Sequence, residues 1–375
     1  MLEKHAATGG LVQSAGSAVR PLADVAVVGA GPAGSVAALS LARAGHRVLL
    51  LGVPPVANAR RFGESLIGGA RPLLRDLELL SVVEQGPHLP CYGNASAWGD
   101  GTLVTTDFIR DPNGPGWHLD RATFDNDVRD AAIKEGAIYC KGRVCSVKWA
   151  DEVWQLNMDR SSMRARWLID ATGRSAMMAR RLGIARSEDD RLCAIYAWFA
   201  AAPSDHDART LIEAVEHGWW YSALLPGRVR VAILHVDSDT LPRREATPRF
   251  WHMHIARTTH LRAVLSDATC LTMPRATAAG GTRLAEFAGD RWLAAGDAAM
   301  AFDPLSSRGI FNSLYSGMRA AQAVASALGG DGDAPLRYAQ GLERIYSAYQ
   351  TQRHVAYGAE QRWVESPFWT RRALL

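Results

Sequence analysis

Apolar positions first gather in a run that predicts a buried strand, a helix and a second strand. Ala23–Val28 is short, apolar and rich in β-branched residues, and glycines follow it at once. Ser35–Ala44 has the alanine and leucine content of a helix that ends at Gly45, and Arg47–Leu51 is typical of a second buried strand. This order predicts a compact β-α-β unit of the dinucleotide-binding type.

The rest of the chain alternates between segments that extend this unit and segments of a different character. Arg166–Ile169 and Trp292–Ala295 are further buried-strand patterns, strand-like segments follow one another between residues 186 and 282, and apolar residues recur at helical spacing over Ile310–Leu328. The pattern predicts an α/β fold: a Rossmann-like domain, an inserted and mainly antiparallel β-sheet domain, and a helical C-terminal segment. The expected ranges are 21–85, 120–185 and 283–330 for the nucleotide domain, 86–119 and 186–282 for the substrate domain, and 331–375 for the C-terminal segment.

Composition and charge narrow the class of protein. The chain has 375 residues and a formal net charge of +4, and its arginines are scattered, so nucleic acid is not an expected partner. Its 5 cysteines form no CxxC pair, which suits a reducing cytoplasm. Residues 1–20 lack the apolar core of a secretory signal and are expected to be a flexible extension. The uncharged stretch at 25–42 contains the glycines, which would interrupt a membrane helix, so no membrane contact is expected.

The glycine segment after the first strand carries the first chemical signal. The loop between the predicted strand and helix consists of Gly29, Ala30, Gly31, Pro32, Ala33 and Gly34. Its glycines let the backbone turn sharply and approach a pyrophosphate, whose negative charge then faces the helix N-terminus. The end of the second strand departs from the pattern, because Gly52 stands where an acidic residue usually meets the adenosine ribose.

A second set of segments indicates which dinucleotide is bound. Gly296-Asp297-Ala298-Ala299 follows a predicted strand, and Asp303-Pro304-Leu305 and then Gly309 precede a long predicted helix. This arrangement resembles the second flavin-binding motif of the p-hydroxybenzoate hydroxylase-like FAD monooxygenases. The resemblance implies that FAD is the cofactor, that Asp297 holds its ribitol chain, and that backbone amides at the helix start face the flavin ring. The residues of this region expected to bind FAD are Gly296, Asp297, Pro304, Arg308, Gly309 and Ile310.

Other segments resemble one branch of that superfamily. Arg121-Ala122-Thr123-Phe124-Asp125 is similar to the family's Arg-x-x-Phe-Asp segment near the flavin, and Asp170-Ala171-Thr172-Gly173 resembles its strand-end motif beside the cofactor. Phe62-Gly63-Glu64-Ser65-Leu66 and Gly218-Trp219-Trp220-Tyr221 resemble the branch of flavin-dependent halogenases and of flavoproteins that mature tryptophan-derived quinone cofactors of amine dehydrogenases and amino-acid oxidases. The resemblance implies further FAD contacts at Glu64, Ser65, Arg121, Asp170 and Gly173.

Two activities within this branch can be distinguished by their residues. Tryptophan-type halogenases deliver hypohalous acid through a lysine that follows the Gly-Glu-Ser segment, whereas the lysines of this chain are Lys4, Lys134, Lys141 and Lys148. Ser306-Ser307-Arg308-Gly309 also replaces the Glu-Ser-Thr-Gly of their halide site. These departures disfavour halogenation and favour insertion of oxygen into an electron-rich aromatic ring through a flavin hydroperoxide.

The predicted function is therefore FAD-dependent monooxygenation of an aromatic substrate, which the resemblance implies is a tryptophan side chain of a partner peptide or protein. Dioxygen is the co-substrate, and the reductant is NADH, NADPH or a separate reductase. Glu64, Tyr221 and His235 are candidates for proton transfer. Trp219, Trp220 and Tyr221 are candidates for lining the substrate site, although residues of a strand alternate in direction and at most two can face one cavity.

Three other readings stay open. They are a flavin-dependent halogenase, an FAD-dependent reductase of a small molecule and, in a different class, a non-catalytic flavin-binding partner protein. No metal site is predicted, because His252 and His254 have no carboxylate or cysteine at ligand spacing. The pattern does not indicate an oligomeric state.

Overall fold

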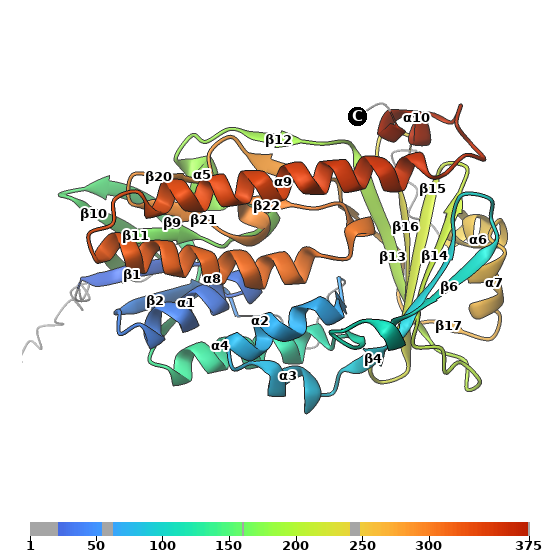
Figure 1. Cartoon of the computed structure of the whole chain (residues 1–375), viewed down its shortest axis with the longest axis horizontal. Coiled ribbons are helices and arrows are strands. Elements are labelled where there is room, and N and C mark those ends of the chain that lie inside the picture. Colours follow the sequence, from blue (N-terminus) through green and yellow to red (C-terminus); the bar gives the residue numbers. More distant parts are fainter. Residues whose placement is uncertain (1–21, 55–62, 160, 241–247, 374–375) are drawn as a thin grey trace, which may run out of the picture.

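Two sheets lie at opposite ends of the molecule, and long helices run between them (Figure 1). This computed structural model describes residues 22–54, 63–159, 161–240 and 248–373. The extension expected at residues 1–20 lies outside the described residues.

The first sheet has 8 strands in the order β20-β21-β11-β1-β2-β8, and β10 and β9 continue from β11. β1 pairs in parallel with β2 and β11, and β2 with β8, as expected for a dinucleotide-binding unit. Its strands are β1 (Ala23–Val28), β2 (Val48–Gly52), β8 (Ile138–Lys141), β9 (Val144–Ala150), β10 (Val153–Met158), β11 (Ser161–Asp170), β20 (Ala288–Gly289) and β21 (Trp292–Ala294).

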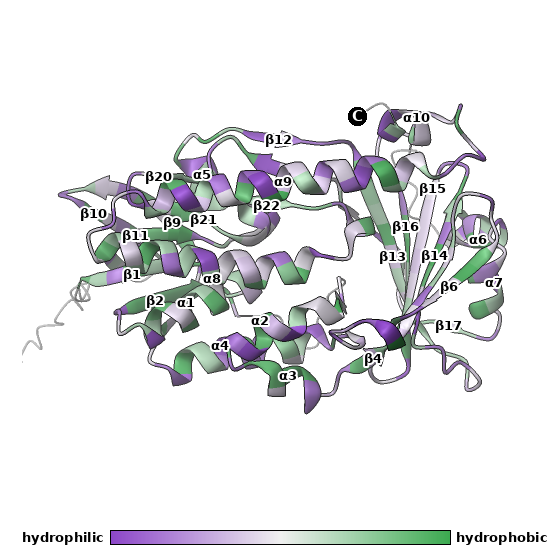
Figure 2. Cartoon of the chain, viewed as in Figure 1, coloured by the Kyte–Doolittle hydropathy of each residue, from purple (hydrophilic) through white to green (hydrophobic). Residues whose placement is uncertain are grey.

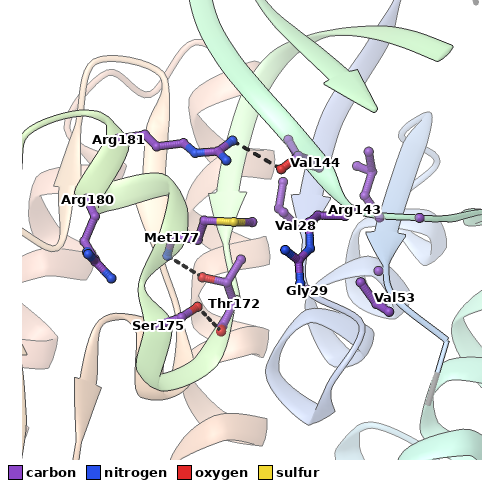
Figure 3. Close-up of a pocket in the computed structure, with 13 residues that line it drawn as sticks. Val28, Gly29, Val53, Arg143, Val144, Thr172, Ser175, Met177, Arg180 and Arg181 are labelled. Atoms are coloured by element: carbon purple, nitrogen blue, oxygen red, sulfur yellow. Dashed lines mark hydrogen bonds between the residues drawn. The ribbon is translucent and has the colours of Figure 1, made fainter. Parts of the chain in front are cut away.

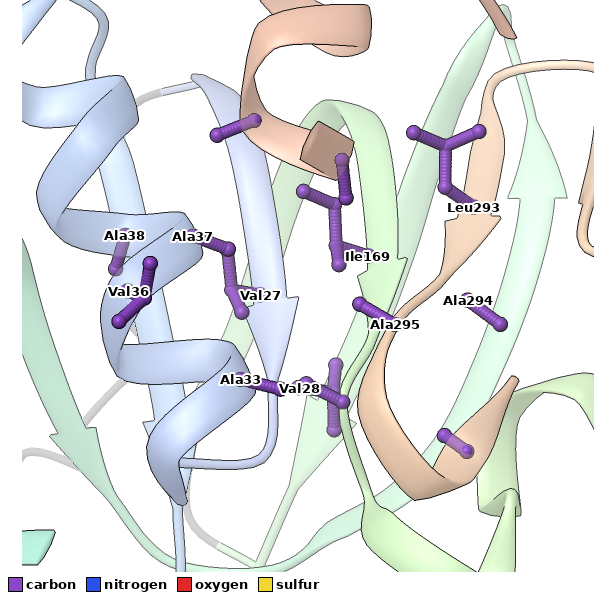
Figure 4. Close-up of a cluster of buried hydrophobic side chains, with 14 of the residues drawn as sticks. Val27, Val28, Ala33, Val36, Ala37, Ala38, Ile169, Leu293, Ala294 and Ala295 are labelled. Atoms are coloured by element: carbon purple, nitrogen blue, oxygen red, sulfur yellow. The ribbon is translucent and has the colours of Figure 1, made fainter. Parts of the chain in front are cut away.

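Small residues let the helices on this sheet pack closely against one another. Ala37 of α1 lies beside Val27 of β1 (Figure 4), and Val36 belongs to the same buried cluster. A Cβ on Gly317 of α8 would lie 2.3 Å from the carbonyl oxygen of Ala33, so α1 and α8 touch through their backbones. The helices of this part are α1 (Pro32–Arg43), α2 (Arg71–Asp76), α3 (Leu80–Glu84), α4 (Arg121–Lys134), α5 (Met177–Arg181), α8 (Gly309–Leu328) and α9 (Ala334–Gly358).

The second sheet also has 8 strands, in the order β17-β13-β16-β15-β14-β5-β6 with β18 beside β13. All of its pairings are antiparallel except that between β14 and β5. Its strands are β5 (Gly93–Ala97), β6 (Leu103–Asp107), β13 (Leu192–Ala200), β14 (Thr210–Val215), β15 (Gly218–Leu225), β16 (Val229–Asp237), β17 (Thr269–Cys270) and β18 (Arg275–Ala278).

Each face of the second sheet is covered by different helices. One face packs with α6 (Pro248–Ala256) and α7 (His260–Val264), which were not expected in this strand-rich region. The other packs with the end of α9 and with α10 (Pro367–Ala373). Two three-stranded sheets join the parts, formed by β3 (Ser65–Leu66), β4 (Leu89–Cys91) and β7 (Gly116–His118), and by β12 (Arg186–Glu188), β19 (Thr282–Leu284) and β22 (Met300–Ala301).

The predicted fold class is confirmed: a Rossmann-like α/β part, a mainly antiparallel sheet and C-terminal helices are all present. Figure 2 shows hydrophobic positions on strands such as β13, whereas α9 carries many hydrophilic positions. None of the described helices has both the length and the apolar character needed to cross a bilayer.

Candidate functional site

A cavity of about 400 Å³ lies between the two sheets, and we call it the central cavity. One side is formed by the loops that follow β1, β11 and β21, which are carboxyl ends of parallel strands, where open α/β sheets bind ligands. The other side includes Tyr221 of β15 and Ile233 and His235 of β16. Both sheets therefore contribute to one site.

Two more pockets extend the central cavity along the edge of the first sheet. The outer pocket, of about 670 Å³, is lined by Gly29 after β1, Val53 after β2 and Arg143 before β9 (Figure 3). The connecting pocket, of about 90 Å³, shares Val53 with the outer pocket and Gly31 with the central cavity. The three pockets thus adjoin in a row that passes over the glycine loop.

Close packing explains the glycines of this loop. A Cβ on Gly29 would lie 2.1 Å from the carbonyl oxygen of Ala171, and a Cβ on Gly34 would lie 1.8 Å from that of Gly29. Gly29 also has a φ of +111°, a conformation that favours glycine. By contrast, a Cβ on Gly31 would meet nothing within 4 Å, so a ligand can approach the backbone there.

Packing also explains why Gly52 replaces the acidic residue common at this strand end. A Cβ on Gly52 would lie 2.6 Å from the Cβ of Ala30, so β2 and the glycine loop are too close for a side chain. The outer pocket beside them is bordered by Arg143, Arg180 and Arg181 (Figure 3). Basic side chains from α5 and from the residue just before β9 therefore border this end of the row.

Two helices begin at the central cavity. α1 begins at Pro32 and α8 at Gly309, and both residues line the cavity. The first N–H groups of a helix have no intrahelical partner and favour anionic or polar ligands. Asp297 lines the same cavity; burial raises the pKa of its carboxyl group, and the nearby Arg174 and Arg121 oppose that rise.

Most residues predicted to bind the cofactor line the central cavity. They are Gly31, Pro32, Ala33, Glu64, Ser65, Arg121, Gly173, Asp297, Pro304, Arg308, Gly309 and Ile310. Gly29 instead lines the outer pocket, Gly34 packs on the backbone of Gly29, and a Cβ on Gly296 would lie 2.8 Å from that of Ala33.

The structure gives Asp170 a different role from the predicted cofactor contact. Its carboxylate is fully buried and accepts hydrogen bonds from the backbone N–H groups of Thr172, Met178 and Ala179, at 3.0, 2.9 and 2.8 Å. These donors include the start of α5, whose first N–H groups need partners. Asp170 therefore shapes the strand-end loop and does not line the central cavity.

Glu64 is the most unusual polar residue of the central cavity. It is 1% exposed, and neither carboxylate oxygen has a hydrogen-bond partner within the described ranges. Desolvation by burial raises its pKa from 4.5 to about 7, against smaller opposing effects of backbone N–H groups and Arg121. Near neutral pH the carboxyl group can thus both accept and release a proton.

Tyr221 and His235 belong to the second sheet and line the same central cavity as Glu64. Burial raises the pKa of Tyr221 well above its ordinary value, and the nearby Glu64 raises it further, so the phenol keeps its proton. Burial lowers the pKa of His235 to about 3, so its imidazole is neutral at neutral pH. Its Nδ1 is buried without a partner in the part of the chain that the structure describes. His235 is therefore suited to hydrogen bonding rather than to acid catalysis.

Two of the three aromatic residues predicted to line the substrate site do not line the cavity. Alternation along β15 turns Trp220 to the opposite face of the sheet, where it packs against Trp251. Trp219 points to the same face as Tyr221 but lies behind His235, with ring centroids 3.7 Å apart and planes 13° apart. Only Tyr221 of the three lines the central cavity.

Several lining residues were not predicted from the sequence. Phe302 and Arg174 each adjoin a recognised motif, so their proximity could have been expected. Ile233 and Thr277 had no such signal, because their positions depend on how the second sheet meets the first. Among the described residues, no group of three potential ligands could hold a metal ion.

The site fits FAD on three structural grounds. The row of pockets is elongated, as is a dinucleotide, and its middle is the glycine loop. The first turns of α1, after Pro32, and of α8, from Gly309, present backbone N–H groups that can bind anionic and polar groups of a cofactor. The central cavity also holds Glu64, whose buried oxygens need a partner that a ligand can supply.

Comparisons with known proteins agree with this geometry. A profile of the "Glucose inhibited division protein A" family matches residues 24–106, and one of the "Tryptophan halogenase" family matches residues 106–374. The chain belongs to the tryptophan halogenase family. As a member of this flavin-dependent halogenase family, it is an FAD-dependent oxidoreductase.

Three known proteins resemble most of the chain. A protein of Marinomonas mediterranea described as an FAD-dependent oxidoreductase, LodB, is 30% identical, covering 93% of this chain and 96% of LodB. The structure of CmlS, a flavin-dependent halogenase, matches with 25% identity and a TM-score of 0.83, over 94% of this chain and 68% of CmlS. The structure of QhpG matches with 26% identity and a TM-score of 0.78, over 94% of this chain and 79% of QhpG. QhpG is described as a peptidyl tryptophan dihydroxylase essential for tryptophylquinone cofactor biogenesis.

Proposed function

We propose that this protein is an FAD-dependent monooxygenase that hydroxylates the tryptophan side chain of a partner peptide or protein. The observation that carries the proposal is the composition of the central cavity. Its ionisable lining residues include arginines, buried carboxyl groups and His235, and no lysine is among the described residues that line it. Lys134, Lys141 and Lys148 are exposed on α4, β8 and β9. A tryptophan-type halogenase would need a lysine in this space.

The similarity to QhpG supports the substrate part of the proposal, because that protein is a peptidyl tryptophan dihydroxylase. An indole ring is electron-rich and needs no prior deprotonation, which suits a cavity whose histidine is neutral. FAD, when reduced by NADH, NADPH or a separate reductase, supplies activated dioxygen at this site.

The residues of the chain then have separate tasks. Ile233, Phe302 and Ala279 place apolar surface at the cavity and exclude water from the reacting ring. Tyr221 can donate a hydrogen bond that orients the substrate. Glu64 can accept the proton that leaves the ring carbon when aromaticity is restored, because its pKa is about 7.

Halogenation is the second candidate, and it is favoured by the similarity to CmlS.

One experiment distinguishes hydroxylation from halogenation. Purified holoenzyme is incubated aerobically with a reductant and tryptophan-containing peptides, with and without chloride or bromide, and each peptide is weighed by intact mass spectrometry. Gain of one or two oxygen atoms irrespective of halide supports hydroxylation, and a halide-dependent gain of halogen supports the alternative. A peptide with phenylalanine in place of tryptophan is the matched control. No mass change with any peptide contradicts the proposed substrate class.

A further inference from the structure

Tyr357, near the end of α9, joins the second sheet to the loop that carries the FAD motif. It is 1% exposed. Its hydroxyl donates to Oδ2 of Asp303 at 2.8 Å and accepts from Nε1 of Trp219 at 3.1 Å. An indole N–H can only donate and a phenol has one proton, so the two directions are fixed.

The Asp303 end of this link determines the geometry of the cofactor loop. Asp303 lines the central cavity and is 1% exposed. Its Oδ1 accepts from the N–H of Leu305 at 2.9 Å, which closes the turn that leads to Gly309. Its own N–H donates to the hydroxyl of Tyr349 at 2.9 Å, also on α9. The position of Asp303 therefore sets where α8 begins at the cavity.

The Trp219 end reaches the opposite wall. Trp219 is fully buried and its ring stacks on that of His235, with centroids 3.7 Å apart. His235 lines the central cavity, whereas neither Trp219 nor Tyr357 does. The link thus starts at the cavity with His235 and returns to it at Asp303, through two residues that no ligand in the cavity would touch.

Core packing alone does not require this hydroxyl. The Tyr357 ring contacts Trp98, Phe368 and Trp369, and a phenylalanine could keep these contacts. Tyr338, on the same helix, offers a comparison: its buried hydroxyl donates to the carbonyl oxygen of Ala294 at 2.7 Å and so ends on backbone. The hydroxyl of Tyr357 instead bonds to two side chains on different sides of one cavity.

We propose that Tyr357 is a positioning residue that couples FAD binding at the 303–310 loop to the placement of His235 on the substrate side. When FAD binds and orders the loop, the position of Asp303 is fixed. The hydrogen bonds between Asp303 and Tyr357 and between Tyr357 and Trp219 then fix the Trp219 ring, on which the ring of His235 stacks. The coupling needs FAD but no particular substrate, so it can be tested whether or not the hydroxylation proposal holds.

A double-mutant cycle on FAD affinity tests the coupling. The dissociation constant of FAD is measured by flavin fluorescence for the wild type, Trp219→Phe, Tyr357→Phe and the double variant. Trp219→Phe is expected to weaken FAD binding about fivefold, which corresponds to one neutral hydrogen bond, and Tyr357→Phe, which also loses the bond to Asp303, at least as much. The double variant is expected to bind FAD no more weakly than Tyr357→Phe alone. Tyr338→Phe is the matched control, because it removes another buried, bonded hydroxyl of α9, and its effect is expected to multiply with that of Trp219→Phe.

Two outcomes would overturn the proposal: Trp219→Phe leaves FAD affinity unchanged, or the effects of Trp219→Phe and Tyr357→Phe multiply. Should Trp219→Phe not fold, hydrogen exchange with Tyr357→Phe alone gives the answer. FAD is expected to slow amide exchange over residues 229–237 in the wild type but not in Tyr357→Phe, with protection of residues 303–310 kept in both. Equal protection of residues 229–237 in both proteins contradicts the coupling.

Discussion

Burial of Glu64 predicts that the FAD-free protein loses stability as the pH rises through neutrality. Its carboxyl group has a pKa of about 7 in the folded protein against 4.5 when unperturbed. Between these values the folded state holds a proton that the unfolded state has released, so the free energy of unfolding falls as the pH rises. This pKa shift contributes about 3 kcal/mol to the free energy of unfolding at low pH. The contribution is fully lost above the pKa of the folded state.

The assay is urea unfolding of FAD-free wild type and Glu64→Gln from about pH 5 to about pH 8, where the glutamine cannot ionise. Other titrating groups are common to both proteins, so their contributions cancel in the difference. The stability of Glu64→Gln relative to wild type is expected to increase with pH. Glu365→Gln, at an exposed position, is the control and is expected to follow the wild type. Parallel curves for wild type and Glu64→Gln would refute the argument that desolvation holds a proton on Glu64.

The same ionisation should appear in turnover if Glu64 accepts the ring proton. Product formation is then expected to rise with pH through the pKa of Glu64, near 7 before cofactor and substrate bind. Glu64→Gln is expected to bind FAD and consume reductant while forming far less product and more hydrogen peroxide. Normal coupling of reductant to product in this variant would assign the proton to another group.

Three further substitutions test other parts of the structure. Gly34→Ala places a methyl group 1.8 Å from the carbonyl oxygen of Gly29. It is expected to lower the free energy of unfolding in urea by about 1–3 kcal/mol and to weaken FAD binding. Wild-type affinity for FAD would contradict the close packing. Asp170→Ala leaves buried backbone donors without partners and is expected to cost about 3 kcal/mol or more, measured in the same way. Trp220→Phe is expected to lower stability by about 1–3 kcal/mol yet leave FAD affinity and turnover unchanged, since Trp220 faces away from the cavity; slower turnover at unchanged stability would contradict that placement.

Local patterns predicted the parts of the site that depend on local backbone geometry. The glycine loop at Gly29–Gly34 and the segment from Asp297 to Ile310 lie at the cavity edge because strand ends and helix starts are encoded by neighbouring residues. Alternation along β15 correctly limited how many of its aromatic residues could face one cavity.

What the sequence could not predict depends on contacts between distant segments. Trp219 points toward the correct side, but the stacked ring of His235 from β16 separates it from the cavity. The carboxylate of Asp170 accepts hydrogen bonds from N–H groups of α5. The sequence motif gives no information on the orientation of α5, so Asp170 was predicted to contact the cofactor. The helical character of α9 was expected, whereas the bond from Tyr357 to Asp303 spans 54 residues and has no local signature.

The contact between Gly52 and Ala30 limits how cofactor preference can change in this chain. In many β-α-β units a single acidic substitution at this strand end alters recognition of the ribose. Here any such side chain would displace the glycine loop, since its first carbon would already overlap Ala30. Substitutions that change the outer pocket are therefore expected at Arg143 and Arg180, which line it and lie far along the chain from the glycine loop.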